Sequence, residues 1–390
     1  MKKLLIVDGN SILNRAYYGI RPLTAPDGTP TNAVYGFLNI LFKYLEEEKP
    51  EYLCVAFDVK EKTFRHKMYD LYKAQRKPAP EDFLVQLPLI KEVLGAMNCA
   101  CIEKAGYEAD DLIGTVSRLC EEKDIDCRIL TGDKDDLQLA SGNTVIKLVV
   151  TRMGKTETTD YNADAVAEKY GVTPGEFIDV KGLMGDPSDN IPGVKGVGEK
   201  TAFSLIQNYH SIENIYENLD ALEVTPAVKH KLEADKDSAF LSKTLATIDR
   251  QVPIELDFES FRRVPYDTKA VGALFTRLNF KSFLEKLEIP MEERTAHQEA
   301  ITGTLQRIHT AEFDNLLKDC KEVDYMLSES AGGFDLLFTA DGETVYHLPE
   351  VSMAELKRFF EDPGVAKCGY CMKEDIRLDG QIPSVLRLLP

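Results

Sequence analysis

Short apolar runs rich in β-branched residues alternate with amphipathic stretches over the first 170 residues of the chain. Three strand-like runs stand out at 4–7, 52–57 and 127–131, with amphipathic helical patterns at 33–47 and 83–97. This alternation predicts an α/β fold with a mainly parallel sheet flanked by helices. In such a sheet the ligand site collects at the carboxyl ends of the strands, and an acidic residue or Gly-Asp directly follows each run.

Two further helices with a hairpin between them are indicated beyond residue 170. Thr173-Pro174-Gly175-Glu176 has the pattern of a capping box with proline at the first helical position, so we expect a helix from there to about Gly185. Several glycines then permit a tight turn before a helix from Glu199, whose N-terminus can hold phosphates. The hairpin residues that we expect to hold a nucleic-acid backbone are Gly193, Lys195, Gly196, Gly198 and Lys200.

Acidic residues form five short clusters in the first half of the chain. They are Asp8; Asp58; Glu108, Asp110 and Asp111; Asp133 and Asp135; and Asp186 and Asp189. Carboxylates gathered at one place repel each other strongly unless divalent cations lie between them. Oxygen ligands without supporting His or Cys point to Mg²⁺ or Mn²⁺, and so many carboxylates suit two ions that cut a phosphodiester.

Each acidic cluster also has an ordinary structural interpretation. Asp8 after a strand can cap a helix, Glu108–Asp111 can favour a helix N-terminus, and Asp133–Asp136 can be a solvated loop. The segment Asp186–Asn190 has the composition of a turn. Their joint occurrence at strand and helix ends of one sheet favours a common site over these separate interpretations.

A basic segment with aromatic residues directly follows Asp58. Its cations are Lys60, Lys62, Arg65, Lys67, Lys73, Arg76 and Lys77, and Phe64, Tyr69 and Tyr72 lie among them. This composition is typical of a surface that grips phosphates and stacks the bases of a single strand. The alternative is a solvated helical face.

Composition limits the remaining possibilities. The chain has 390 residues, 44% of them hydrophobic, which suffices for two or three domains with proper cores. With 47 basic and 65 acidic residues its net charge is −18, which argues against nonspecific coating of DNA but not against a focused site. No apolar run is long enough to span a membrane, and Met1-Lys2-Lys3 leads into a strand rather than a signal peptide. Eight scattered cysteines favour free thiols, so the expected location is the cytoplasm.

Together these motifs resemble the 5′-nuclease domain of bacterial DNA polymerase I, within the flap-endonuclease family. The segments that carry the resemblance are Val7–Ser11, Ala56–Asp58, Gly106–Asp111, Thr131–Asp135 and Gly185–Gly193. The resemblance implies a PIN-like catalytic core at 1–172 with a helical arch at 60–85, and a helix-hairpin-helix subdomain at 173–290.

The resemblance also implies roles for single residues. Asp8, Asp58, Glu108, Asp110 and Asp111 would serve mainly one metal, and Asp133, Asp135, Asp186 and Asp189 the other. Tyr72, Lys73 and Arg76 would belong to an arch threaded by a free 5′ end, with Lys73 and Arg76 also taking part in catalysis and Arg65 binding DNA. The Gly193–Gly198 hairpin would grip duplex DNA and could bind K⁺ through carbonyl groups.

Residues beyond 290 depart from this pattern. We expect a linker at 291–310 and strands at 323–327 and 334–338, resembling the start of a proofreading-exonuclease domain with a partial RNase H-like fold at 311–390. An active version needs an Asp-x-Glu pair on its first strand, but Met326 stands two residues after Asp324. We therefore expect this part to lack 3′-5′ exonuclease activity, and no counterpart of a polymerase domain is present in the sequence.

The function indicated is a metal-dependent, structure-specific 5′-3′ exonuclease and flap endonuclease of replication and repair. Its expected substrates are DNA with 5′ flaps or nicks and RNA primers; we expect a monomer, fused to a polymerase domain if the chain is a fragment. The alternative is a DNA-structure-binding accessory module whose catalysis is unimportant. A small RNA-cleaving domain of related architecture is disfavoured by the hairpin and by the length of the chain.

Overall fold

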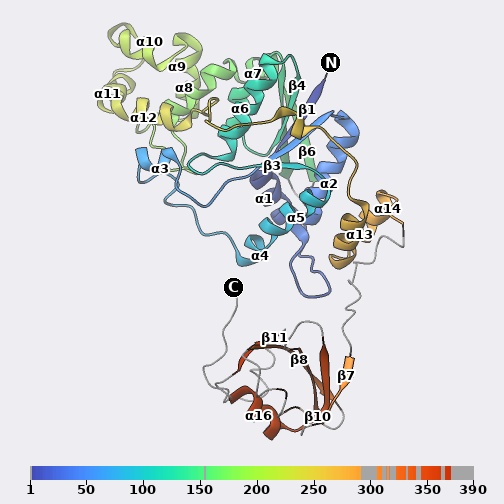
Figure 1. Ribbon diagram of the computed structural model, residues 1–390. Helices are drawn as coiled ribbons and strands as arrows, with labels where there is room; N and C mark the ends of the chain where they lie inside the picture. The colour runs from blue at the N-terminus through green and yellow to red at the C-terminus, as the bar shows by residue number, and fades with distance from the viewer. Residues whose placement is uncertain are drawn as a thin grey trace. The chain divides into compact units, whose positions relative to one another are not determined.

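The computed structural model describes residues 2–152 and 155–290, and then parts of the C-terminal region. Those parts are 305–309, 313, 316, 322–330, 333–339, 344–361 and 365–369. The chain divides into two compact units, Met1–Ala296 and His297–Pro390 (Figure 1). Most of the expected linker at 291–310 lies outside the described residues, as does the end of the chain after residue 369.

A six-stranded sheet in the order β3-β2-β1-β4-β5-β6 forms the centre of the first unit. Its strands are β1 (Lys3–Asp8), β2 (Tyr52–Ala56), β3 (Ala100–Ile102), β4 (Asp126–Thr131), β5 (Thr144–Arg152) and β6 (Lys155–Tyr161). All neighbouring strands are parallel except β5 and β6, which are antiparallel. The predicted mainly parallel sheet and the three predicted strands are therefore confirmed.

Both faces of the sheet are buried, which explains why its strands are continuous apolar runs rather than alternating ones. On β1, Leu4 and Ile6 point into one hydrophobic cluster, and Leu5 and Val7 point into the other. Helix α6 (Ala109–Glu122) covers the first face. Helices α1 (Gly9–Gly19), α2 (Asn32–Glu48) and α5 (Gln86–Ala96) cover the second.

The strand order places a switch point beside β1. From β1 the chain proceeds to β2 and β3 on one side, and it returns to add β4 and β5 on the other. Loops leaving β1 and β4 therefore diverge and leave a crevice at the carboxyl ends of these strands, where ligands bind in open α/β sheets.

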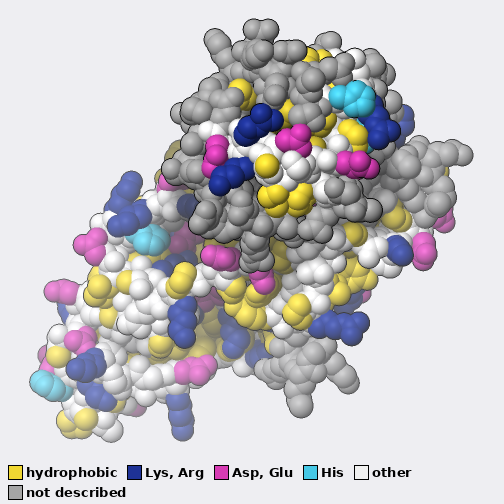
Figure 2. All heavy atoms as spheres, turned by 90° about the horizontal axis from the view of Figure 1, so that it is seen from below, with side chains coloured by type: hydrophobic (Ala, Val, Ile, Leu, Met, Phe, Trp, Pro, Cys, Tyr) yellow, Lys and Arg dark blue, Asp and Glu magenta, His cyan; other side chains and the backbone are white. Residues whose placement is uncertain are grey.

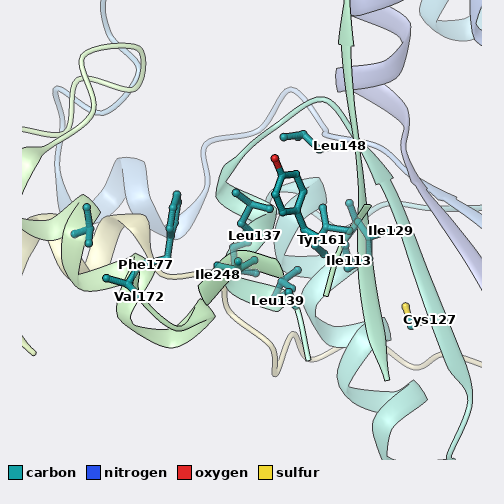
Figure 3. Packing of buried hydrophobic residues seen from close by; sticks show 14 of the residues in the cluster. Ile113, Cys127, Ile129, Leu137, Leu139, Leu148, Tyr161, Val172, Phe177 and Ile248 are labelled. Atoms are coloured by element: carbon teal, nitrogen blue, oxygen red, sulfur yellow. The ribbon is translucent and has the colours of Figure 1, made fainter. Parts of the chain in front are cut away.

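A short 3₁₀ helix, η1 (Asp135–Leu139), follows β4 and is anchored by two leucines. Leu137 and Leu139 are buried beside Ile113 of α6, Tyr161 of β6 and Ile248 (Figure 3). Because these contacts fix η1, they also fix the acidic residues at its start.

Small helices make up most of the rest of the first unit, several of them gathered around the hairpin (Figure 1). They are α4 (Glu81–Leu84), α7 (Ala163–Tyr170), α8 (Pro174–Met184), α9 (Glu199–Tyr209), α10 (Ile212–Glu217), η2 (Leu219–Ala221), α11 (Pro226–Ala234), α12 (Lys236–Ala246) and η3 (Phe258–Phe261). The capping box predicted at Thr173 is present, since Thr173 and Glu176 exchange side-chain to backbone hydrogen bonds. The helices predicted to begin at Pro174 and Glu199 are confirmed.

Residues 268–289 pack on the helices that cover the sheet and not on the group of small helices. Helices α13 (Thr268–Arg277) and α14 (Lys281–Lys286) bury Phe275 and Phe283 in the cluster that also contains α2 and α5. The end of the predicted range 173–290 thus packs on the catalytic core.

Two glycines close the loop between α8 and the hairpin. Gly185 and Gly193 both have positive φ, 71° and 62°. A Cβ on Gly193 would lie 2.3 Å from the backbone nitrogen of Gly185, so a side chain there would push the two strands of the loop apart. This close approach holds Asp186 and Asp189 in a tight turn, closed by hydrogen bonds between the backbones of Asp186 and Ile191.

The helical arch expected at 60–85 is not observed as a helix. Only α3 (Phe64–Met68) and α4 are helical there, and residues 70–75 form turns. Tyr69, Tyr72, Ile191, Leu241 and Leu245 form a small hydrophobic cluster, so this segment lies against α12. Side-chain contacts hold the segment in an irregular conformation that its composition alone did not predict.

The second unit contains a five-stranded mixed sheet in the order β11-β8-β9-β10-β7. Its elements are β7 (Leu305–Arg307), β8 (Glu322–Ser330), β9 (Gly333–Thr339), β10 (Val345–Val351), α16 (Met353–Glu361) and β11 (Ala366–Gly369). The strands predicted at 323–327 and 334–338 are confirmed. The more specific RNase H-like assignment stays a prediction.

Among the described helices of both units, none combines the length and apolarity that a membrane crossing requires.

Candidate active site

The first functional side chains come from the ends of strands. Asp8 is the last residue of β1 and the N-cap of α1: its Oδ1 accepts a hydrogen bond from the Ser11 N–H at 3.0 Å. Its Oδ2 accepts one from the Thr131 hydroxyl at 3.0 Å, at the end of β4. The carboxylate is thereby fixed in the crevice between β1 and β4, and it is only 4% exposed.

The N-terminus of α6 supplies the next group. Asp58, just after β2, accepts a hydrogen bond from the Ala109 N–H at 2.8 Å. Glu108 is the N-cap of α6, and Asp110 follows in the first turn. Acids at these positions are stabilised by the free N–H groups of the helix.

These acids line one open cleft of about 730 Å³. Of the nine acids singled out in the sequence, it brings together Asp8, Asp58, Glu108, Asp110 and Asp133. The basic residues at its wall are Arg15, Lys73 and Arg76. The remaining four acids lie beside the cleft, each paired with a cation of the protein.

Asp111 does not face the cleft. It is fully buried, and Arg65 donates two parallel hydrogen bonds to its carboxylate, both 2.8 Å long. The backbone N–H groups of Glu108 and Asp249 complete its partners. A carboxylate satisfied in this way has no free position for a metal, so its place in the structure does not fit the metal role expected for it.

Arg65 likewise does not fit the DNA-binding role expected for it. Its side chain is 3% exposed, and besides Asp111 it donates to the carbonyl oxygens of Leu245 and Thr247. Arg65 therefore joins α3, α6 and the end of α12 from the inside, where no phosphate can reach it.

Tyr72, Lys73 and Arg76 form a polar bridge over the acids. The Tyr72 hydroxyl is within hydrogen-bond distance of Glu108 at 3.0 Å and of Asp189 at 3.3 Å. Lys73 donates to Glu108 at 2.7 Å, and Arg76 is paired with Asp189. Tyr72 is buried, whereas half of the Arg76 side chain remains exposed.

Lys181, which sequence reasoning missed, holds two acids of the second group. Its ammonium lies 2.6 Å from Asp135 and 2.5 Å from Asp186. Burial alone would lower the pKa of Lys181, but these two carboxylates raise it, so the amine stays charged. Its place one turn before the end of α8 and five residues before Asp186 was the available signal.

Asp136 is the second residue missed, because Asp133–Asp136 could be interpreted as a solvated loop. Instead it lies in η1 with no exposed surface, and its carboxylate lies with those of Asp8 and Asp110. One oxygen from each of the three lies within 4.8 Å of the others. The signal was the apolar pattern of Leu137 and Leu139, which marks η1 as buried.

Close packing of carboxylates shifts their protonation. Burial, with the negative charges of Asp58 and Asp133, raises the pKa of Asp8 to about 7. Burial and Asp133 raise the pKa of Asp135 to about 6 despite Lys181. Burial and the charges of Asp136 and Asp8 raise the pKa of Asp110 well above its usual range. Burial and the charges of Asp8 and Asp133 do the same to the pKa of Asp136. Burial and mutual repulsion thus disfavour the negative charge on these carboxylates as long as no cation lies between them.

The donor set fits oxygen-preferring divalent ions. The ligands on offer are carboxylates; one buried pair of oxygens, on Asp136, has no hydrogen-bond partner. Neither His nor Cys joins this group within the described part of the chain, so Mg²⁺ or Mn²⁺ suits it better than zinc.

The predicted hairpin residues differ in what they present. Gly193 is buried and its N–H donates to the Ser242 hydroxyl at 2.9 Å, so it closes the turn and does not present that group to a phosphate. Gly196, Gly198, Lys195 and Lys200 are exposed. Basic and acidic side chains are interspersed on the face drawn in Figure 2.

Two family models match consecutive parts of the chain. The model of the N-terminal resolvase-like domain of 5′-3′ exonucleases matches residues 3–171. The model of their C-terminal SAM-fold domain matches residues 172–269. Together they include the sheet, the cleft and the hairpin.

Curated relatives bear the name DNA polymerase I. That of Caldicellulosiruptor bescii is 46% identical over 285 residues, which are 73% of this chain and 33% of that protein. That of Geobacillus stearothermophilus is 38% identical over 367 residues, 93% of this chain and 40% of that protein. The chain thus spans about one third of the length of the first of these relatives.

The fold is shared with the flap endonuclease of bacteriophage T5, solved in complex with DNA and metal ions. The TM-score is 0.53 at 21% identity, and the match covers 74% of this chain and 99% of that one. At this identity the likeness supports the fold.

The raised pKa of Asp8 predicts how the stability of the metal-free protein depends on pH. The carboxyl binds its proton more tightly in the folded chain than in the unfolded one, so the free energy of unfolding should fall as pH rises from about 4 to above 7. We expect a melting temperature several degrees lower at pH 8 than at pH 6 in EDTA, measured by calorimetry, and a smaller difference for Asp8→Asn. An equal pH dependence in the two proteins would contradict this assignment.

Proposed function

The chain belongs to the 5′-3′ exonuclease family, and we propose that it cuts DNA with 5′ flaps or nicks and removes RNA primers in a metal-dependent reaction. The observation that carries the proposal is the acidic cleft at the switch point of the sheet, walled by Lys73 and Arg76. The nuclease fold and the family of both domains are shown by the matches over residues 3–269. The substrate classes are part of the proposal and do not follow from these matches alone.

Mg²⁺ or Mn²⁺ is the proposed cofactor. Asp8 and Asp110 would hold one ion, with Asp58, Glu108 and Asp133 near it at the cleft wall. Asp135, Asp186 and Asp189 could serve a second ion only if Lys181, Lys73 and Arg76 release them. Bound ions of this kind activate water and stabilise the leaving oxygen in an in-line displacement.

Basic side chains would position the scissile strand. Lys73 and Arg76 are the cations at the cleft whose heads remain partly exposed, and a phosphate could compete with Glu108 and Asp189 for them. On the helical side, the exposed Gly196–Lys200 segment and the N-terminus of α9 would hold the duplex.

The hairpin carries a protein cation of its own. The Lys231 ammonium donates to the Gly196 carbonyl at 2.9 Å. We therefore propose that Lys231 supplies charge at the hairpin, where K⁺ was the expectation; any potassium ion would have to share the Gly196 carbonyl with it.

A polymerase is the proposed covalent partner. The relatives named DNA polymerase I are about three times as long as the matched region, and one of them aligns with 93% of this chain. Residues 311–390 are proposed as an inactive structural domain, because Asp324 and the exposed Met326 occupy the positions on β8 where a metal-binding pair would stand. The protein is proposed to act as a monomer on nucleoid DNA in the bacterial cytoplasm.

A DNA-binding module without catalysis is the competing function. An inactive binder would gain nothing from unpaired buried carboxylates, which destabilise a fold in the absence of a cation. Asp136 has two such oxygens, so the site favours catalysis.

Substitution of the two adjacent acids Asp110 and Asp111 of α6 should affect catalysis in one case and stability in the other. Asp110→Asn should lower cleavage of a labelled 5′-flap duplex at saturating Mg²⁺ by at least about 100-fold while flap binding remains, because a charge that stabilises the transition state is lost. Asp111→Asn should instead destabilise the fold by about 3 kcal/mol, since Arg65 would lose its buried partner. Near-normal turnover of Asp110→Asn would remove this residue from the site.

Salt dependence tests the two cations at the cleft. Lys73→Ala and Arg76→Ala should each weaken binding of a 5′-flap duplex and reduce the slope of log affinity against log salt by about 0.9, one phosphate contact each. Lys67→Ala is the control, because Lys67 is exposed on α3 outside the cleft lining. If the slopes for Lys73→Ala and Arg76→Ala do not differ from that for Lys67→Ala, the basic segment after Asp58 is a solvated surface that does not contact phosphates.

A protein truncated after Pro290 tests the second unit. Because residues 1–290 contain both clusters that cover the sheet, it should fold and keep flap cleavage within about twofold of the full chain. Neither protein should shorten a labelled 3′ end or extend it with nucleotides. Shortening of the 3′ end by the full chain alone would overturn the assignment of 311–390 as inactive.

A further inference from the structure

Asp136 is the acid of the site whose buried carboxylate oxygens lack hydrogen-bond partners. It has no exposed surface, and neither carboxylate oxygen has a hydrogen-bond partner among the described residues, because the hydroxyl of the nearby Thr131 donates its one proton to Asp8. Leu137 and Leu139 hold η1 in the hydrophobic cluster, so the Asp136 side chain cannot reach solvent by a small movement of its helix (Figure 3). A buried carboxylate without partners is unstable as a free anion.

Its neighbours are carboxylates that are held in place. The Asp8 carboxylate is fixed by Ser11 and Thr131, and the backbone of Asp110 is fixed in the first turn of α6. Oxygens of these two residues and of Asp136 approach one another within 4.8 Å. Three features therefore coincide at Asp136. Its helix η1 is held in place by buried leucines, one of its oxygens converges with oxygens of Asp8 and Asp110, and neither of its oxygens is paired.

Within the described part of the chain no cation forms an ion pair with these three carboxylates, although each acid beside the cleft has one; Arg15, at the cleft wall, acts on Asp8 only beyond ion-pair distance. Arg65 pairs with Asp111, Lys181 with Asp135 and Asp186, and Arg76 with Asp189. Across the described ranges no lysine, arginine or histidine lies within salt-bridge distance of Asp136. The charge that balances Asp8, Asp110 and Asp136 therefore has to come from solution.

We propose that Asp136 is a direct ligand of a divalent cation, shared with Asp8 and Asp110, and that this ion binds before DNA does. The proposal rests on the proposed metal-dependent function and adds a ligand to it. Each of the three carboxylates offers one oxygen to an Mg²⁺ or Mn²⁺ before any substrate phosphate is present, and water would fill the other coordination positions. Since Lys181 already lies between Asp135 and Asp186, the free protein should hold one ion at the Asp136 site rather than two.

Manganese binding to the full chain without DNA tests the proposal. Titration followed by calorimetry and by the electron paramagnetic resonance of free Mn²⁺ should give one tight site per chain. Asp136→Asn and Asp136→Leu should both weaken this site at least tenfold, which corresponds to about 1.4 kcal/mol. Both variants should also melt at a higher temperature than the parent in EDTA, because an unpaired buried charge has been removed.

Asp179→Asn is the matched control, since Asp179 is a buried carboxylate that does not line the cleft and whose partners are Lys243 and the Ile212 N–H. It should melt at a lower temperature in EDTA and bind Mn²⁺ as the parent does. Mn²⁺ affinity within about twofold of the parent in both Asp136 variants would overturn the proposal. A lower melting temperature of both variants in EDTA would overturn it too, because it would show that Asp136 has a partner in the metal-free protein.

Asp110→Asn distinguishes failure of this inference from failure of the proposed function. If Asp110→Asn weakens Mn²⁺ binding and the Asp136 variants do not, the cleft binds metal without Asp136 and only the added ligand is rejected. If the parent binds one Mn²⁺ through Asp136 but cuts no 5′-flap duplex, the ligand is supported and the proposed nuclease function fails.

Discussion

Repulsion among carboxylates at one edge of a parallel sheet is the constraint on which the first unit depends. The strand order sets Asp8, Asp58 and Asp133 at the ends of neighbouring strands, and α6 adds Glu108 and Asp110. A purely structural α/β domain would place apolar or neutral groups there. The fold tolerates the acids because cations are built in around them: Arg65, Lys73, Arg76 and Lys181 each neutralise one or two carboxylates. Among the described acids of the site, those left without an ion pair are Asp8, Asp58, Asp110, Asp133 and Asp136, and Asp136 is the one whose carboxylate is buried without a hydrogen-bond partner.

The same cations join parts of the chain that are distant in sequence. Arg65 connects α3 with α6 and with the end of α12, and Lys181 connects α8 with η1. Tyr72 and Lys73 connect the segment after β2 with the turn at Asp189. The helical region and the sheet are thus held together through the site, so a change in its charge alters the contacts between them. A substrate phosphate that takes Arg76 from Asp189, or an ion that displaces Lys181, would loosen these connections.

The sequence predicted the sheet and the location of the site because both depend on local patterns. Strands β1, β2 and β4 are apolar runs that no helix pattern fits, and the capping box at Thr173 starts a helix by local hydrogen bonds. The sequence could not show that the adjacent residues Asp110 and Asp111 have different roles. About 100° of rotation along α6 turns one toward the cleft and the other toward Arg65, and only tertiary packing decides which. The segment expected to form a helical arch is only partly helical for a similar reason, because its aromatic and basic residues contact Glu108, Asp189 and α12.

Asp136 shows what a local pattern hides. In sequence it is the last of four polar residues after a strand, which is typical of an exposed loop. In the structure the two leucines that follow determine its environment, because η1 must bury them beside Ile113 and Ile248. A carboxylate that its neighbours place inside the protein needs a partner there, and two more carboxylates lie beside this one. Burial of the leucines on one side of η1 therefore places Asp136 next to Asp8 and Asp110 on the other side. A cation from solution is a partner that can neutralise all three carboxylates at once.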